Sequence, residues 1–248
     1  MTPDLANGLD ALQTRFQCAA YCASPDVPER NLQDEGGIPA TRPLALVRPD
    51  TVEGIADAIK ICSAYGIKIV PQGGMSEVVG GAHPQTGSIA LSTERFSGVE
   101  KIGAENSTMT IRAGTPLEVA QKAAAAAGLL LSLDLGSRGS CNIGGVLSTN
   151  AGGNRVIRYG MARALTLGLE VVLPDGQILS NMGKMIKNNS GYDLKHIFIS
   201  AEGTLGLITR AVLRLVPAPA SNQAALIGVK DYAAAAAVRF SAVKNGPA

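Results

Sequence analysis

Residues 67–81 have the sequence IKIVPQGGMSEVVGG, in which a short apolar run passes directly into a loop with four glycines. The run at 67–70 is typical of a buried strand. Glycines after a strand allow a backbone with positive φ, and their N–H groups can converge on an anion without a Cβ in the way. The loop has neither the GxGxxG pattern nor the GK[ST] ending of a Walker loop. Two interpretations therefore stay open: an ordinary glycine-rich turn and a loop that binds a diphosphate.

The residues before this loop predict a strand–helix–strand unit. Residues 43–48 (PLALVR) indicate a buried strand, and an Asp-Thr cap precedes a helix expected over 52–65, with Gly66 as its C-terminal stop. A strand, a capped helix and a strand within about thirty residues form a βαβ unit. We therefore expect the strands at 43–48 and 67–70 to be parallel and adjacent. Another short strand is expected at 89–92.

After residue 92 the pattern indicates a second lobe with mainly antiparallel strands. Residues 107–112 alternate between apolar and polar, 116–127 predict an amphipathic helix, and 165–180 predict a strand pair interrupted by a Pro-Asp-Gly turn. Residues 206–216 (GLITRAVLRLV) alternate again and end at Pro-Ala-Pro, which is typical of a domain edge.

The two ends of the chain flank this central region, so we expect three parts at 1–40, 41–217 and 218–248. Residues 1–40 are expected to form a helical lead-in, because apolar side chains recur at helical spacing at Leu5, Leu9, Leu12 and Phe16. The last predicts a strand at 224–229 and a helix at 232–243. They are expected either to begin a substrate or cap domain that is truncated, or to pack back as a C-terminal extension.

Composition excludes several classes of protein. With 248 residues and 46% hydrophobic content, the chain can bury a sizeable core. Its formal charge of +2 is too small for the positive field that nucleic acid binding requires. The longest apolar stretches, such as 123–131, are far shorter than the ~20 residues of a membrane-spanning helix. The first ten residues lack the features of a signal peptide, so we expect a soluble, cytoplasmic protein.

Cysteine and histidine are sparse. The cysteines form no CxxC pair, and the residues that could act as soft metal ligands are Cys18, Cys22, Cys62, Cys141, His83 and His196. Zinc or disulfide chemistry is an alternative, but scattered thiols in such a chain are usually buried apolar residues, and we assign no metal.

Three further glycine-rich segments follow the first loop. They are SCNIGG at 140–145, TNAGG at 149–153 and EGTLGLIT at 202–209. A single compact turn needs no such set, whereas a long ligand in an extended pose would use several places of close backbone approach. FAD, with a diphosphate between its adenosine and its isoalloxazine, is such a ligand.

Many motifs of residues 43–217 occur in the order seen in the vanillyl-alcohol-oxidase-type, or PCMH-type, flavoproteins. The chain most resembles the FAD-linked D-2-hydroxyacid dehydrogenases, a branch that includes enzymes for D-2-hydroxyglutarate, D-lactate and glycolate. The motifs are VPQGG at 70–74, LDLG at 133–136, GSC at 139–141, IGG at 143–145, TNAGG at 149–153, RYG at 158–160, LGLEVVLPDG at 167–176, GYDLK at 191–195 and EGTLGLIT at 202–209. The resemblance implies an α+β fold, a PCMH-type FAD-binding domain with a small parallel βαβ lobe and a larger, mainly antiparallel lobe.

The resemblance also implies which residues bind FAD. The loop around the diphosphate would be Gln72, Gly73, Gly74, Met75, Ser76 and Glu77. The rest of the cofactor would be lined by Asp134, Leu135, Gly136, Ser140, Gly144, Gly145, Asn150, Gly152, Gly153, Gly203 and Ile208. Some relatives attach FAD covalently through a His in the first loop, and no His stands there, so non-covalent FAD is expected.

The chain departs from the family pattern at three places. Glu77 stands where relatives have Gly, which places a carboxylate near a dianion and predicts weaker FAD binding. Val146 replaces a frequent Asn. The substrate-binding Arg, the metal-binding His pair and the general base His of the family have no counterparts, and His83 and His196 are interpreted as structural or surface residues. Lys184, Lys187 and Asn188 are interpreted as a solvated loop.

Two functions remain open at this stage. The first is the FAD-binding portion of an enzyme that oxidises a D-2-hydroxyacid to the 2-oxoacid by hydride transfer to flavin N5, with electrons passed to an acceptor of unknown identity. By itself this chain is then expected to bind FAD without turning over a hydroxyacid. The second is a truncated or degenerate flavin-fold protein that acts as a binding or scaffold module without catalysis.

Overall fold

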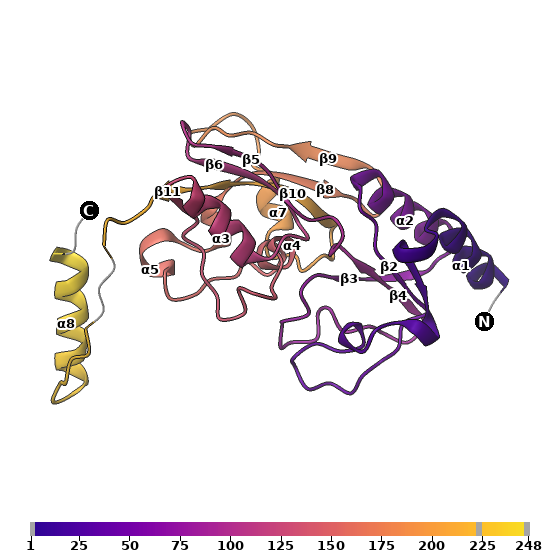
Figure 1. The fold of residues 1–248 in the computed structure, drawn as a ribbon, viewed down its shortest axis with the longest axis horizontal. Helices are drawn as coiled ribbons and strands as arrows, with labels where there is room; N and C mark the ends of the chain where they lie inside the picture. The colour runs from indigo at the N-terminus through magenta and orange to yellow at the C-terminus, as the bar shows by residue number, and fades with distance from the viewer. Residues whose placement is uncertain (1–2, 222–224, 246–248) are drawn as a thin grey trace. The chain divides into compact units, whose positions relative to one another are not determined.

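The computed structural model describes residues 3–221 and 225–245, which fall into two compact units separated between Ala218 and Pro219 (Figure 1). The second unit contains helix α8 (Tyr232–Asn245), so the helix predicted at 232–243 is confirmed. Residues 225–229 form no strand, and the strand predicted there is wrong, whereas Ala224 lies outside the described residues. Among the described residues, no strand pairs with this segment to supply the ladder hydrogen bonds that a strand requires.

The first unit begins with a small sheet whose strand order is β1-β2-β4-β3. Its strands are β1 (Tyr21–Ala23), β2 (Ala45–Val47), β3 (Lys68–Gln72) and β4 (Ser88–Ser92). Helix α2 (Val52–Ala64) joins β2 to β3, and the Thr51 hydroxyl caps it by accepting a hydrogen bond from Gly54 N at 3.0 Å. The predicted cap, helix and parallel strands are therefore confirmed.

One prediction about this sheet is wrong. The strands at 43–48 and 67–70 are parallel but not adjacent, because β4 lies between them and pairs with both. β4 is buried at every position, as expected of a central strand with both faces covered. The return loop after β3 therefore leads the chain back into the middle of the sheet, and the glycine-rich residues lie on that loop.

The N-terminal residues belong to the core of this small lobe. Helix α1 (Pro3–Arg15) contributes the buried side chains Leu12 and, just beyond its end, Phe16. Strand β1 was not predicted and pairs antiparallel with β2. The short 3₁₀ turns that surround β1 are Cys18–Ala20, Ser24–Asp26 and Glu29–Asn31.

The larger lobe is built on a five-stranded sheet with the order β5-β6-β10-β8-β9, and all of its pairings are antiparallel, as predicted. The strands are β5 (Val99–Gly103), β6 (Thr108–Arg112), β8 (Thr166–Val172), β9 (Ile178–Asn181) and β10 (Leu207–Arg214), of which β5 was not predicted. A separate two-stranded ladder pairs β7 (Leu129–Leu130) with β11 (Val216–Pro217).

Helices cover one face of the larger sheet, where α3 and α4 enclose its apolar core (Figure 1). They are α3 (Leu117–Ala126), α4 (Ile143–Ser148), α5 (Val156–Tyr159), α6 (Ala162–Leu165) and α7 (Lys195–Phe198). The core includes Met109, Leu131 and Leu147, each at most 1% exposed. Among the helices that the structure describes, none combines the length and apolar character needed to cross a membrane.

Candidate functional site

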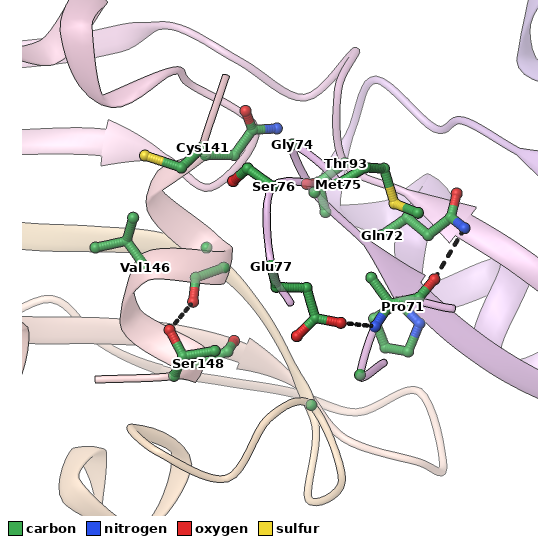
Figure 2. Close-up of a pocket in the computed structure, with 18 of the residues that line it drawn as sticks. Pro71, Gln72, Gly74, Met75, Ser76, Glu77, Thr93, Cys141, Val146 and Ser148 are labelled. Atoms are coloured by element: carbon green, nitrogen blue, oxygen red, sulfur yellow. Dashed lines mark hydrogen bonds between the residues drawn. The ribbon is translucent and has the colours of Figure 1, made fainter. Parts of the chain in front are cut away.

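A cavity of about 320 Å³ lies where the loop after β3 faces helix α4 and the turn before β10. This volume is in the range of small-molecule sites. Figure 2 shows Gln72, Met75 and Glu77 on one wall and Cys141, Val146 and Ser148 on the other. The glycine-rich segments, far apart in sequence, thus line one space. Of the predicted residues, those in the lining are Gln72, Gly73, Gly74, Met75, Ser76, Glu77, Leu135, Gly144, Gly145, Gly203 and Ile208.

The loop that lines this cavity has backbone N–H groups without a hydrogen-bond acceptor among the described residues. Among the hydrogen bonds of the described residues, none is donated by the N–H groups of residues 74–77. Met75 has φ of 56°, and a left-handed residue in such a turn points successive N–H groups to one side, as in anion-binding nests. The loop backbone can therefore hold an anion. The residue that adopts the positive φ is Met75 and not one of the glycines.

The side chain of Gln72 fixes the loop after β3. The side chain is buried, and its Nε2 donates to Asn31 O at 3.0 Å and to Ala82 O at 3.1 Å. Its Oε1 accepts from Asn31 Nδ2 at 2.9 Å. Because every polar atom of the amide is engaged, Gln72 joins both ends of the loop to the N-terminal segment.

Gly74 is required by packing. A Cβ at this position would lie 1.8 Å from Ser140 O, far inside van der Waals contact. This approach presses the first glycine-rich segment against the second. At the neighbouring Cys141, burial raises the pKa of the thiol, although hydrogen bonds oppose the shift in part. A protonated thiol is a poor nucleophile, so this cysteine is not activated for covalent attachment.

The two glycines at the start of α4 differ in role. A Cβ on Gly144 would lie 2.9 Å from Ala113 Cβ, so Gly144 allows the helix to pack on the end of β6. Gly145 has nothing within 4 Å of that position and opens toward the cavity. The first is therefore a packing glycine and the second leaves space for a ligand.

Six predicted residues lie outside the cavity lining: Asp134, Gly136, Ser140, Asn150, Gly152 and Gly153. Asp134 pairs with Arg138 at 3.0 Å and Arg155 at 3.4 Å, while Asn150 Oδ1 accepts from Arg163 N at 2.9 Å. A Cβ on Gly153 would lie 1.9 Å from Asp134 O. These groups hold the glycine-rich segments together behind the cavity.

Several lining residues were not assigned to FAD binding from the sequence. They are Pro71, Gly81, Ala82, Thr93, Ser137, Cys141, Asn142, Val146, Ser148, Thr149, Ala151, Glu202 and Leu207. Most belong to the glycine-rich motifs or directly adjoin them, so assigning whole motifs rather than selected positions would have included them. Thr93 follows β4 and has no motif, and only the insertion of β4 beside β3 brings it to the cavity.

Glu77 lies in the cavity wall, but its carboxylate turns back to its own loop. Its Oε1 accepts a hydrogen bond from Ala82 N, the dashed contact beside Glu77 in Figure 2, at 2.6 Å. Burial raises the pKa of the Glu77 carboxyl group, the Ala82 hydrogen bond opposes this, and the nearby carboxylates of Asp34 and Glu202 raise the pKa further.

Comparison with known proteins agrees with this geometry. The family described as FAD binding domain matches residues 43–181, more than half of the chain. The chain therefore belongs to the FAD-binding domain family, and its cofactor is FAD. The free N–H groups of residues 74–77 and the open space beside Gly145 fit the diphosphate of this dinucleotide.

Among curated proteins, the chain is 40% identical over 190 residues to D-2-hydroxyglutarate dehydrogenase from Xanthomonas citri pv. viticola, covering 77% of this chain and 40% of that protein. It is also 40% identical over 188 residues to the mitochondrial D-2-hydroxyglutarate dehydrogenase of Bos taurus, covering 76% and 35%. The chain thus spans well under half the length of these relatives.

Among solved structures, alkyldihydroxyacetonephosphate synthase matches with a TM-score of 0.77 and 23% identity, covering 89% of this chain and 41% of the other. At this identity the likeness concerns the fold alone. It confirms the predicted α+β, PCMH-type arrangement of two lobes.

Asp134→Asn tests the role of the residues behind the cavity. We expect a loss of about 1 kcal/mol in the free energy of unfolding, because a charged hydrogen-bonding group is neutralised, and a change in FAD dissociation constant below about threefold. Urea denaturation and FAD titration measure the two quantities, with Asp57→Asn as the control for an exposed pair with Arg15. Loss of FAD binding without loss of stability would instead place Asp134 at the cofactor.

Proposed function

We propose that this chain binds FAD non-covalently and is the cofactor-binding portion of an enzyme that oxidises a D-2-hydroxyacid to the 2-oxoacid. The observation that carries the proposal is the set of N–H groups at residues 74–77 that donate no hydrogen bond within the described residues, on a loop that lines a cavity together with the other glycine-rich segments. The 40% identity to D-2-hydroxyglutarate dehydrogenases supports the substrate class.

The residues of the cavity bind and orient the cofactor rather than the substrate. Bound FAD supplies a hydride acceptor. The loop backbone holds the diphosphate, while Leu207 and Ile208, both buried in β10, exclude water from one side. Within the lining that the structure describes there is no Arg, Lys or His, so this surface has neither a cation for a substrate carboxylate nor an imidazole base. Those groups must come from elsewhere in the complete enzyme.

We therefore expect FAD binding without hydroxyacid turnover. Purified chain incubated with FAD should be yellow after gel filtration, should melt at a higher temperature with FAD, and should release the flavin on acid precipitation. D-2-hydroxyglutarate and D-lactate should not reduce the bound flavin at enzymatic rates.

Two results would contradict this proposal in different ways. A colourless protein with an unchanged melting temperature would leave a scaffold role, whereas steady reduction of the flavin by a hydroxyacid would show that the groups absent from this cavity are not essential. The electron acceptor is proposed only as a separate redox partner. The cytoplasmic location stays a prediction, which fractionation of cells that express a tagged chain would test.

A further inference from the structure

The loop that follows β3 is held from outside by an acidic residue of the N-terminal segment. Asp34 is 7% exposed, and its Oδ1 accepts a hydrogen bond from Gly36 N at 2.9 Å. Its Oδ2 accepts from Gly80 N, on the far side of the loop, also at 2.9 Å. One carboxylate therefore ties the N-terminal segment to the return of the loop.

Glu77 binds the same part of the loop from within. Its Oε1 accepts from Ala82 N, and its backbone oxygen accepts from Glu35 N at 3.0 Å. This carboxylate packs closely against Gly81, where a Cβ would lie 3.1 Å from Glu77 Oε2. The carboxyl groups of Asp34 and Glu77 act on each other: Glu77 lowers the pKa of Asp34, and Asp34 raises the pKa of Glu77. The two carboxylates thus accept hydrogen bonds from backbone N–H groups two residues apart in the loop, those of residues 80 and 82.

We propose that Asp34 and Glu77 are positioning residues of the FAD site, which share one proton and together hold the return of the loop so that FAD binds more tightly while that proton is present. This inference rests on the proposed FAD binding. It assigns a role to Glu77, whose carboxylate the sequence analysis treated only as a defect.

The two carboxyl groups and the cofactor use different backbone N–H groups of this region. Asp34 and Glu77 take the N–H groups of residues 36, 80 and 82, whereas those of residues 74–77 stay free for the diphosphate. With the proton, the pair carries one negative charge. Without the proton, the pair carries two negative charges. In a partly buried site these charges repel each other, and they also repel the diphosphate.

The groups around the pair favour Glu77 as the proton carrier. Burial raises the pKa of Asp34, but the hydrogen bonds from Gly36 N, the Glu77 side chain and Gly80 N, with His83 nearby, bring the pKa below its ordinary value. The pKa of Glu77 is raised by burial and by Asp34 and Glu202. The side chain of Glu35 is exposed. Since loss of the Glu77 proton needs rising pH, FAD affinity should fall as pH rises.

The experiment is an FAD titration of the wild-type chain and of Glu77→Gln between about pH 5 and pH 8. If bound FAD raises the pKa of the shared proton by one unit, the wild-type dissociation constant rises about tenfold across this range. Glu77→Gln keeps an oxygen for Ala82 N but cannot ionise, so its dissociation constant should stay flat and fall below that of the wild type at the upper pH.

Two further variants identify the titrating group. Glu105→Gln changes an exposed carboxylate between β5 and β6 and should follow the wild-type profile. His83→Gln removes the imidazole that faces Asp34 and should keep the slope. A wild-type profile without a slope, an equal slope in Glu77→Gln, or a slope lost in His83→Gln would each overturn the inference while leaving FAD binding intact. No FAD binding at any pH would overturn the proposed function as well.

A measurement without FAD tests the shared proton directly. At neutral pH the infrared spectrum of the wild-type chain should contain the carbonyl stretch of a protonated carboxyl group. This band should disappear in Glu77→Gln and in Asp34→Asn, and persist in Glu105→Gln. A spectrum in which neither of the first two substitutions removes such a band would show that the pair holds no proton.

Discussion

Gly74→Ala is expected to destabilise the folded chain by about 3 kcal/mol and to abolish FAD binding. The added Cβ would lie 1.8 Å from Ser140 O, 2.6 Å from Ser140 C and 2.9 Å from Cys141 Cα. All three atoms belong to backbone, so no flexible side chain can move aside. The loop after β3 must shift away from the second glycine-rich segment, which separates the two walls of the cavity.

Gly73→Ala is the matched control, one residue earlier in the same loop. Its Cβ would lie 3.6 Å from Asn142 Cβ, an ordinary contact, and its backbone does not have positive φ. We expect the free energy of unfolding to change by less than about 1 kcal/mol. Urea denaturation of both variants, followed by FAD titration, makes the comparison. Equal stability of the two variants would show that the approach of Gly74 to Ser140 is not a structural requirement.

This contrast between neighbouring glycines explains which parts of the site the sequence could predict. A motif such as PQGG marks a place of close backbone approach, and the cavity does form there. The motif does not indicate whether a ligand or another segment of the chain approaches the backbone. At Gly145 it is open space, whereas at Gly74 and Gly153 it is another segment of the chain. For that reason the predicted list contains both cavity residues and residues that hold the walls together.

Contacts between residues far apart in the sequence were the other feature that local patterns could not predict. Local patterns predicted α2, β4 and β10 because capping residues and apolar periodicity act over a few neighbouring residues. The insertion of β4 between β2 and β3 depends on which edges meet in three dimensions. Asp34, which binds the same part of the loop as Glu77, lies 43 residues earlier in a segment without a motif. No local signal could distinguish a solvent-exposed Glu77 from one that is bound in the loop.

Arg210→Met is expected to cost about 3–5 kcal/mol in the free energy of unfolding at neutral pH. Glu170 in β8 is 2% exposed, and its carboxylate accepts hydrogen bonds from Arg210 Nε at 2.8 Å and from the Thr209 hydroxyl at 2.9 Å. A register shift between Ile208 and Arg210 in β10 allows both residues to reach the same carboxylate. Without the guanidinium, a buried negative charge keeps only the hydroxyl groups of Thr209 and Ser180 as partners. Because Leu207 and Ile208 of the same strand line the cavity, FAD affinity should fall as well.

The pH dependence identifies the cause of this loss. Burial acts to raise the pKa of Glu170, but hydrogen bonds from Arg210 and Thr209 bring the pKa below its ordinary value. The stabilisation is therefore complete above the pKa of an unfolded Glu, about 4.3, and is lost as pH falls through the lower folded value. In Arg210→Met burial prevails and Glu170 takes up a proton at higher pH, so the deficit relative to wild type should shrink between neutral pH and about pH 5.

Urea denaturation at both pH values measures this change, and Arg15→Met provides the control. Arg15 pairs with Asp57 at 2.8 Å, but both side chains are well exposed, at 47% and 39%. An exposed pair of this kind contributes about 0–1 kcal/mol, so the control should lose little stability at either pH. A deficit in Arg210→Met that is equally large at both pH values would point to lost packing of the arginine stem. In that case the unpaired charge of Glu170 would not be the cause of the lost stability.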